Sequence, residues 1–138
     1  MRPALDLKAL SEPLQDLTPA DHEILDKSVK LIGDGKHIQA LAYLTELTVS
    51  NPRNSALRVI RAYALLEMGN IAGALGDARI AEDSGTHSAY KCWFLAQVAY
   101  MAGDKPLCRR EIKHLAGNVT YAPGVEKLSD DLKRPAAQ

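Results

Sequence analysis

The side chains that most often carry out chemistry are few in this chain and lie far apart. The four histidines are at positions 22, 37, 87 and 114, and neither cysteine, Cys92 or Cys108, has a neighbour at the spacing of a zinc or redox motif. No His-Glu-x-x-His pattern and no pair of acids at a metal-binding spacing occurs. We therefore expect no catalytic residue, no metal site and no cofactor, and we interpret both cysteines as small hydrophobic residues.

Two other patterns could bind an anionic group. The segment Gly33-Asp34-Gly35-Lys36 resembles part of a phosphate-binding loop, but no predicted strand precedes it, so we interpret it as a turn between helices. A basic stripe on one predicted helix could contact RNA or an acidic partner; it comprises Lys105, Arg109, Arg110, Lys113 and His114. The equal numbers of basic and acidic residues, 17 each, and the lack of aromatic side chains on that stripe argue against a nucleic-acid partner.

The composition fits one soluble domain with a continuous core. The chain has 138 residues, of which 46% are hydrophobic. No apolar run approaches the roughly 18 residues of a membrane-spanning helix, and the first residues include acids where a signal peptide would need an apolar stretch. We therefore expect no membrane insertion, and the cysteine content fits a reducing, cytoplasmic location.

Three glycines divide the chain into equal units. Gly35, Gly69 and Gly103 recur at intervals of 34 residues, a period typical of stacked helix hairpins. Helix start and stop signals surround them, and the predicted N-caps are Thr18, Asn54 or Ser55, Ser88 and Asp104. These signals predict helix pairs at 19–32 and 36–49, at 55–68 and 71–82, and at 89–102 and 105–116.

The two ends of the chain lie outside this repeat. Residues 1–18 carry leucines at helix-like steps, interrupted by Pro13, which fits either a short broken helix or a loosely ordered arm that could pack on a second copy. The amphipathic segment at about 124–133 predicts a short helix that caps the last repeat. Residues 134–138 are expected to be disordered.

Small residues recur where paired helices would approach most closely. They are Ala40, Ala74 and Cys108 after the three glycines, and Ser28, Ala62 and Ala96 before them. In these features, and in Pro52 at the end of the first unit, the chain resembles the tetratricopeptide repeat (TPR) family, with units of about 21–54, 55–88 and 89–122. The resemblance implies an all-α fold, a right-handed superhelical stack of three helix hairpins in a domain of residues 19–133.

The second unit departs from the family pattern. Arg58 and Arg61 stand where a large apolar side chain is usual, as does Lys27 in the first unit. We expect the aliphatic stems of these three side chains to cover apolar surface while their charges reach water. The first helix of the second unit is therefore expected to be rotated slightly.

In the family, the first helix of each pair lines a concave groove that binds a partner. The corresponding positions here form an apolar and aromatic face, with Phe94 beside them assigned to the core. The predicted groove residues are Leu25, Val29, Ile32, Val59, Tyr63, Leu66, Tyr90, Trp93, Gln97, Tyr100 and Met101. The same stripe at helical spacing would also fit a buried core, or a surface for self-association.

An apolar groove favours a protein-binding module over an enzyme. TPR domains that bind the acidic tails of chaperones use a clamp of lysine and asparagine side chains. Apolar residues replace that clamp here. We therefore expect the groove to bind an extended apolar segment or an amphipathic helix of another protein or peptide. The layout is similar to that of small type III secretion chaperones, which implies a role as adaptor or secretion chaperone. The alternative is an assembly subunit, a homo-oligomer joined through the N-terminal arm or the aromatic face.

Overall fold

The protein folds into helices joined by short turns in a computed structural model that describes residues 2–84 and 88–134. Within these residues no strand occurs, so the predicted all-α class is confirmed. The helices are α1 (Ser11–Leu14), α2 (Pro19–Gly33), α3 (His37–Ser50), α4 (Ser55–Glu67), α5 (Ile71–Asp83), α6 (Ala89–Ala102), α7 (Lys105–His114) and α8 (Ala122–Lys133). His87 and residues 135–138 of the expected disordered tail lie outside the described residues.

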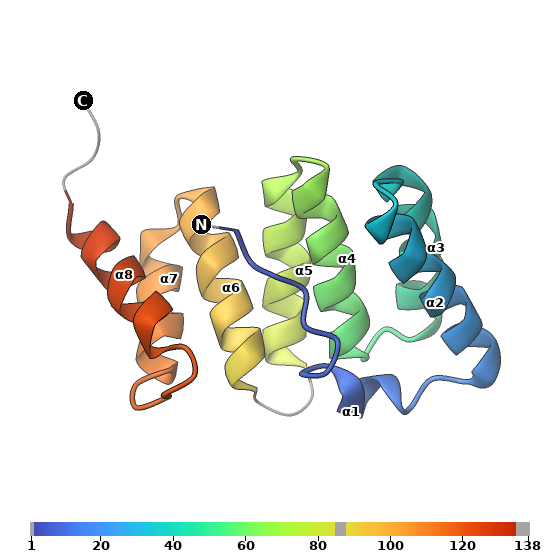
Figure 1. The fold of residues 1–138 in the computed structure, drawn as a ribbon, viewed down its shortest axis with the longest axis horizontal. Helices are drawn as coiled ribbons and strands as arrows, with labels where there is room; N and C mark the ends of the chain where they lie inside the picture. The colour runs from blue at the N-terminus through green and yellow to red at the C-terminus, as the bar shows by residue number, and fades with distance from the viewer. Residues whose placement is uncertain (1, 85–87, 135–138) are drawn as a thin grey trace.

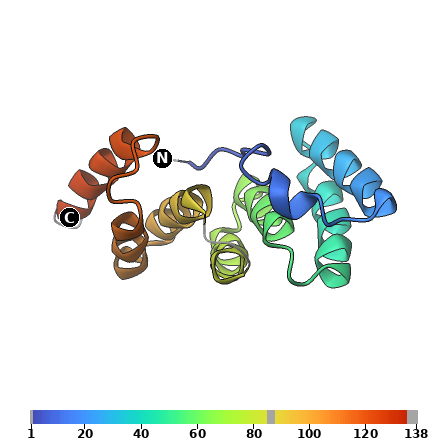
Figure 2. The same cartoon turned by 90° about the horizontal axis from the view of Figure 1, so that it is seen from below.

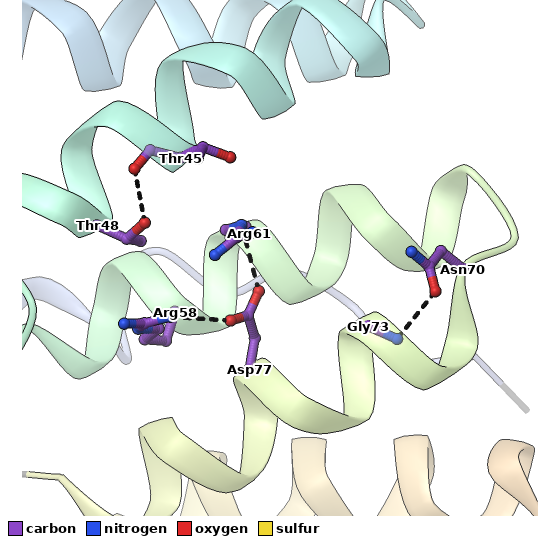
Figure 3. Close-up of polar contacts among 7 residues, drawn as sticks. All are labelled: Thr45, Thr48, Arg58, Arg61, Asn70, Gly73 and Asp77. Atoms are coloured by element: carbon purple, nitrogen blue, oxygen red, sulfur yellow. Dashed lines mark hydrogen bonds and ion pairs between the residues drawn. The ribbon is translucent and has the colours of Figure 1, made fainter.

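The helix starts follow the predicted caps. The Thr18 hydroxyl accepts a hydrogen bond from the backbone N–H of Asp21 (3.1 Å), and Pro19 begins α2. The predicted caps Asn54, Ser88 and Asp104 accept in the same way. Asn70, which was predicted only as part of a turn, also caps α5 (Figure 3). Each cap satisfies an N–H group that the first helical turn leaves without a partner.

The glycines of the repeat end the first helix of each pair. Gly35, Gly69 and Gly103 have φ angles of 78°, 81° and 79°, a left-handed conformation that is costly for a residue with a Cβ atom. The residue after each glycine donates its backbone N–H to the carbonyl oxygen five residues earlier, at 2.8 to 2.9 Å, which is the Schellman pattern. All three turns therefore reverse the chain in the same way.

From α2 to α8 each helix packs against its neighbours in the chain, so the fold is a row of helix pairs (Figure 1). α2 pairs with α3, α4 with α5 and α6 with α7, and the pairs meet where α3 contacts α4 and α5 contacts α6. The small residues predicted at the close approaches are all fully buried: Ser28, Ala40, Ala62, Ala74, Ala96 and Cys108. Larger side chains at these places would force the helices apart.

The row has two layers (Figure 2). α2, α4, α6 and α8 lie on one side, and α3, α5 and α7 lie on the other. We call the first side the inner face, because the N-terminal segment runs along it. α4 and α6 carry the largest sets of buried residues, so the core is centred on them. No helix among the described residues is both long and apolar enough to cross a membrane.

Candidate functional site

The inner face is occupied by the chain's own N-terminal segment. Residues 2–17, called the arm from here on, cross α6 and α4 before the chain enters α2 (Figures 1 and 2). The short helix α1 within the arm contacts α4. Pro3, Leu10 and Leu17 are buried, and Leu10 is only 1% exposed. The arm therefore contributes side chains to the core.

Tyr90 on α6 holds the extended part of the arm by its backbone. The Tyr90 hydroxyl donates to the Ala4 carbonyl oxygen (2.7 Å) and accepts from the Asp6 N–H (3.0 Å). Burial is the main cause that raises the pKa of Tyr90 to about 12, so the hydroxyl keeps the proton that it donates. Because both contacts are to the main chain, this recognition depends on the path of the bound segment and not on its side chains.

Three further contacts, made by Arg2 and Asn54, fix the arm along α4. The guanidinium of Arg2 donates to the Leu66 carbonyl oxygen (3.0 Å) and lies 3.8 Å from the Glu67 carboxylate. Toward the end of the arm, the Asn54 side-chain amide donates to the Pro13 carbonyl oxygen (2.8 Å). Asn54 thus caps α4 and anchors the arm with one side chain.

A cleft of about 520 Å³ remains between the second half of the arm and the N-terminal ends of α4 and α6. The buried side chain of Lys91 lies at this cleft; its Nζ donates to the Ser84 carbonyl oxygen (2.8 Å) and lies 3.5 Å from Ser55 Oγ. Burial lowers the pKa of Lys91, as expected for an ammonium group removed from water. Lys91 therefore links α6 to the end of α5 and the start of α4.

The predicted groove residues all lie on the inner-layer helices, and none is fully exposed. Five are buried: Leu25, Val59, Leu66, Tyr90 and Gln97. Six are half-buried and pack against the core: Val29, Ile32, Tyr63, Trp93, Tyr100 and Met101. Phe94 is buried, as assigned from the sequence. Tyr90 and the Leu66 main chain contact the arm, and contact of the whole set with a partner stays a prediction.

Trp93 is covered by the chain that leads into α8. Its ring stacks on Tyr121, with centroids 5.9 Å apart and an interplanar angle of 25°. A Cβ atom added at Gly124 would lie 2.6 Å from the ring atom Cζ2 of Trp93 and 2.7 Å from Cη2. The absence of a side chain at Gly124 therefore allows the start of α8 to pack directly on the indole ring.

The arginines of the second hairpin are explained by a buried aspartate (Figure 3). Arg58 Nη1 donates to Asp77 Oδ1 on α5 (3.2 Å), and Arg61 Nε lies 3.5 Å from Asp77 Oδ2. The arginine side chains are 19% and 26% exposed and that of Asp77 is 7% exposed. The expectation that both charges simply reach water is wrong, because α5 supplies a carboxylate between them. We call these three residues the α4–α5 cluster.

A second polar cluster joins α5, α6 and α7, and we call it the α5–α7 cluster. Glu82, Cys92, Glu111 and His114 each offer one atom able to bind a metal, and the four atoms lie within 4.8 Å of one another. In the part of the chain that the structure describes, this is the one group in which three or more such side chains converge. The cluster could therefore hold a metal ion, contrary to the expectation from the sequence.

Negative charge dominates the α5–α7 cluster. Glu111 is fully buried; its Oε2 accepts from Arg110 Nε (2.9 Å), and its Oε1 lies 3.6 Å from His114 Nδ1. Burial, followed by the charge of Glu111, raises the pKa of Glu82. Burial, followed by the charges of Glu111 and Glu82, raises the pKa of Cys92 to about 12. A cation placed among these groups would be stabilised by the same charges.

One sequence signal could have identified part of this cluster. Glu111 and His114 form a Glu-x-x-His pair, whose spacing of three residues places both side chains on one face of a helix. Glu82 and Cys92 come from two other helices and have no fixed spacing to that pair. Cys108 lies outside the cluster and packs in the core, where burial raises its pKa to about 11.

The inner face with its arm, and the two polar clusters, are the candidate functional sites among the described residues. In the comparisons with known proteins, no family model matches the chain and no curated protein is detectably similar to it.

Proposed function

We propose that this protein is a binding module of the TPR type whose inner face holds an extended, apolar segment of another protein. The observation that supports the proposal is the arm. The inner face already binds one such segment, through buried apolar side chains and through the main-chain contacts of Tyr90. The arm thus serves as a model of the ligand within the same chain.

The chemistry of the arm indicates what a partner segment would need. Its first part is extended, buries Pro3 and presents the main chain of Ala4 and Asp6 to Tyr90. Its second part contains one helical turn, with Leu10 as the buried anchor just before it. A partner would therefore match this face with a short extended stretch, followed by a large apolar residue at the start of a helical turn.

A partner has to displace the arm before it binds. A segment tethered by a short linker acts at an effective concentration of roughly millimolar. The arm therefore lowers the affinity of every competing segment and excludes weak ligands. A segment that fits better replaces the arm by exchange, without chemistry. This behaviour suits a cytoplasmic adaptor or a secretion chaperone that holds a cargo segment and later releases it.

The state of the two thiols argues against a nucleophilic role for either cysteine. Burial is the main cause that raises the pKa of Cys92 to about 12 and that of Cys108 to about 11. Both thiols are therefore protonated near neutral pH, whereas a nucleophilic cysteine needs a lowered pKa.

The proposal is tested with a labelled synthetic peptide that has the sequence of residues 2–17, measured by fluorescence anisotropy against the full chain. In Leu10→Ala the tethered arm loses its buried anchor, so the inner face becomes available and the peptide should bind at least about 10-fold more tightly than to the unaltered protein. Adding Tyr90→Phe to that variant removes the main-chain hydrogen bonds and should weaken peptide binding about 5-fold.

The matched control is Leu7→Ala, because Leu7 lies in the same arm but is exposed. This change should leave the affinity for the peptide unaltered. Circular dichroism establishes that each variant keeps its helices. Failure of the peptide to bind the folded Leu10→Ala variant would refute the proposal, as would binding that does not respond to Tyr90→Phe.

The arm also favours a second candidate function, assembly by exchange of arms between copies. Its hydrogen bonds reach residues 64 and 86 positions away in the sequence, and a second copy would offer the same acceptor surface. Sedimentation over a range of protein concentrations should then show a dimer that Leu10→Ala weakens. A monomer at every concentration would exclude arm exchange and leave the binding of partner segments as the proposed function.

A further inference from the structure

The α5–α7 cluster has the composition of a metal site, and its residues come from three separate helices. Glu82 lies on α5, Cys92 on α6, and Glu111 and His114 on α7. Their ligand atoms lie within 4.8 Å of one another. The cluster thus gathers sulfur, nitrogen and oxygen donors around one point, at the place where the second hairpin meets the third.

Burial of Glu111 makes this arrangement costly without a cation. The side chain is fully buried; within the described residues its Oε1 atom makes no hydrogen bond of good geometry, although His114 Nδ1 lies 3.6 Å away and the Cys92 thiol interacts with the same carboxylate. A buried acceptor without a partner is destabilising, and a charged one more so. Glu82 adds a second carboxylate that is only 10% exposed. The pair therefore concentrates negative charge where little water can reach it.

Arg110 compensates this charge only in part. Its Nε donates to Glu111 Oε2 at 2.9 Å, while its Nη2 lies 3.9 Å from Glu82 Oε2. The Arg110 side chain is 54% exposed, so much of its charge faces solvent. It leaves Oε1 of Glu111 turned toward His114 Nδ1, at 3.6 Å. That side of the carboxylate is where a metal ion would sit.

We propose that Glu82, Cys92, Glu111 and His114 bind a single zinc ion. Zinc takes four ligands in a tetrahedron, with bonds of roughly 2.0–2.3 Å, so its ligands lie roughly 3.5 Å apart. The four atoms lie within 4.8 Å of one another, so they would have to approach by about 1 Å to reach that spacing. A thiolate and an imidazole favour zinc over magnesium or calcium, which prefer oxygen ligands.

The four protein ligands make this a structural site and not a catalytic one, because no position is left for water or substrate. Arg110 would hold Glu111 in place through Oε2, as outer-shell partners do in other metal sites. The His114 side chain is 40% exposed, which gives the ion a path from solvent. A zinc ion bound here would join α5 to α6 and α7, and so tie the second hairpin to the third.

The test uses the full chain without an affinity tag, stripped of metal with a chelator and then titrated with cobalt(II) or zinc(II). Cobalt(II) should bind at one equivalent per chain. It should give the near-ultraviolet absorption of a thiolate ligand and the visible bands of tetrahedral coordination. Zinc(II) should displace the cobalt and raise the midpoint of thermal unfolding.

Two ligand variants have matched controls in the same chain. His114→Gln, at a half-exposed position, and Cys92→Ala should each weaken metal binding by roughly 100-fold or more, because loss of a direct ligand should exceed the effect of losing an outer-shell partner. Cys108 and His22 lie outside the cluster, so the control variants Cys108→Ala and His22→Gln should bind the metal with the same affinity as the unaltered protein. Circular dichroism of the metal-free proteins shows whether each variant is folded.

Three outcomes would overturn the proposal. The first is less than one equivalent of bound cobalt without a thiolate band, which would indicate adventitious binding only. The second is a titration that the folded His114→Gln variant leaves unchanged. The third is an equal loss of binding in Cys92→Ala and Cys108→Ala, since the effect would then come from the core and not from a ligand.

Discussion

The second and third hairpins share the same turns and the same close helix contacts, yet their polar interiors have opposite charge balance. In the α4–α5 cluster one carboxylate, Asp77, faces two guanidinium groups. In the α5–α7 cluster two carboxylates, Glu82 and Glu111, face one guanidinium that is largely exposed. Similar helix hairpins can therefore carry different buried charges, because those charges depend on side chains outside the turns and the close helix contacts. The first cluster lies within one hairpin and has an excess of positive charge, whereas the second joins two hairpins and has an excess of negative charge.

The surroundings of the two hairpins differ as well. In the third hairpin, Tyr90 contacts the arm and Trp93 contacts the start of α8. In the second hairpin, the outer helix α5 has open positions, such as Gly76, where an added Cβ would meet nothing within 4 Å. The third hairpin is therefore the more constrained of the two.

A matched pair of glycine substitutions tests whether the third hairpin is more constrained than the second. It has the largest expected effect on the free energy of unfolding. Gly124→Ala should lower the free energy of unfolding by about 2 kcal/mol, because its Cβ would overlap the Trp93 ring. Gly76→Ala in α5 should instead raise it by about 0.5–1 kcal/mol, since alanine favours a helix where space is open. Urea unfolding measures both, and Trp93 fluorescence reports the first directly. Equal effects of the two changes would show that α8 does not constrain the third hairpin.

Removal of the shared carboxylate in the α4–α5 cluster comes next. Asp77→Ala leaves Arg58 and Arg61 close together without a counter-charge, and we expect a loss of about 1–2 kcal/mol in the free energy of unfolding. The loss is smaller than for a fully buried pair because both arginines reach solvent in part. Asp83→Ala, an exposed acid at the end of the same helix, is the control. A urea midpoint equal to that of Asp83→Ala would contradict the internal pairing.

The neutral replacement Glu111→Gln should behave differently in the α5–α7 cluster. Glutamine keeps the shape of the side chain and relieves repulsion from Glu82. The free energy of unfolding of the metal-free protein should therefore change by less than about 1 kcal/mol, although Glu111 is fully buried. The stabilisation by zinc should disappear in the same variant. Thermal unfolding with and without zinc measures both effects. A large loss without metal would mean that Arg110 already balances the cluster.

The smallest effect is the pH dependence of the α4–α5 cluster. Burial raises the pKa of Asp77 in the folded state, against the lowering effects of Arg61 and Arg58. Between the unfolded and folded pKa values the folded chain binds more protons, so the contribution of Asp77 to stability increases as the pH falls. The stability of the unaltered protein relative to Asp77→Asn should therefore be greater at about pH 4 than at about pH 7. If this stability difference became smaller on acidification, the arginines would outweigh burial in setting the pKa of Asp77.

The helices and their caps could be predicted from the sequence because each depends on residues within one or two turns. Thr18 and Pro19 mark the start of α2 by their types alone, and Gly103 marks the end of α6 in the same way. These local rules apply wherever the helix lies in the fold.

What covers the inner face could not be predicted, because it depends on contacts between distant parts of the chain. Tyr90 was correctly placed on the inner-layer helix, but its partners lie at Ala4 and Asp6, and no local pattern links them. The pairing of Arg61 with Asp77 was missed because Asp77 lies on the following helix and no local pattern links the two residues. The α5–α7 cluster was missed for the same reason, since three helices contribute to it.

The hydrogen bond between Tyr90 and Ala4 also sets an order of events during synthesis of the protein. The two residues are 86 positions apart, so the arm is made long before the helix that receives it. At roughly 5–20 residues per second, the ribosome needs about 4–17 s to cover that distance. Throughout this interval the nascent arm exists without its docking site on α6.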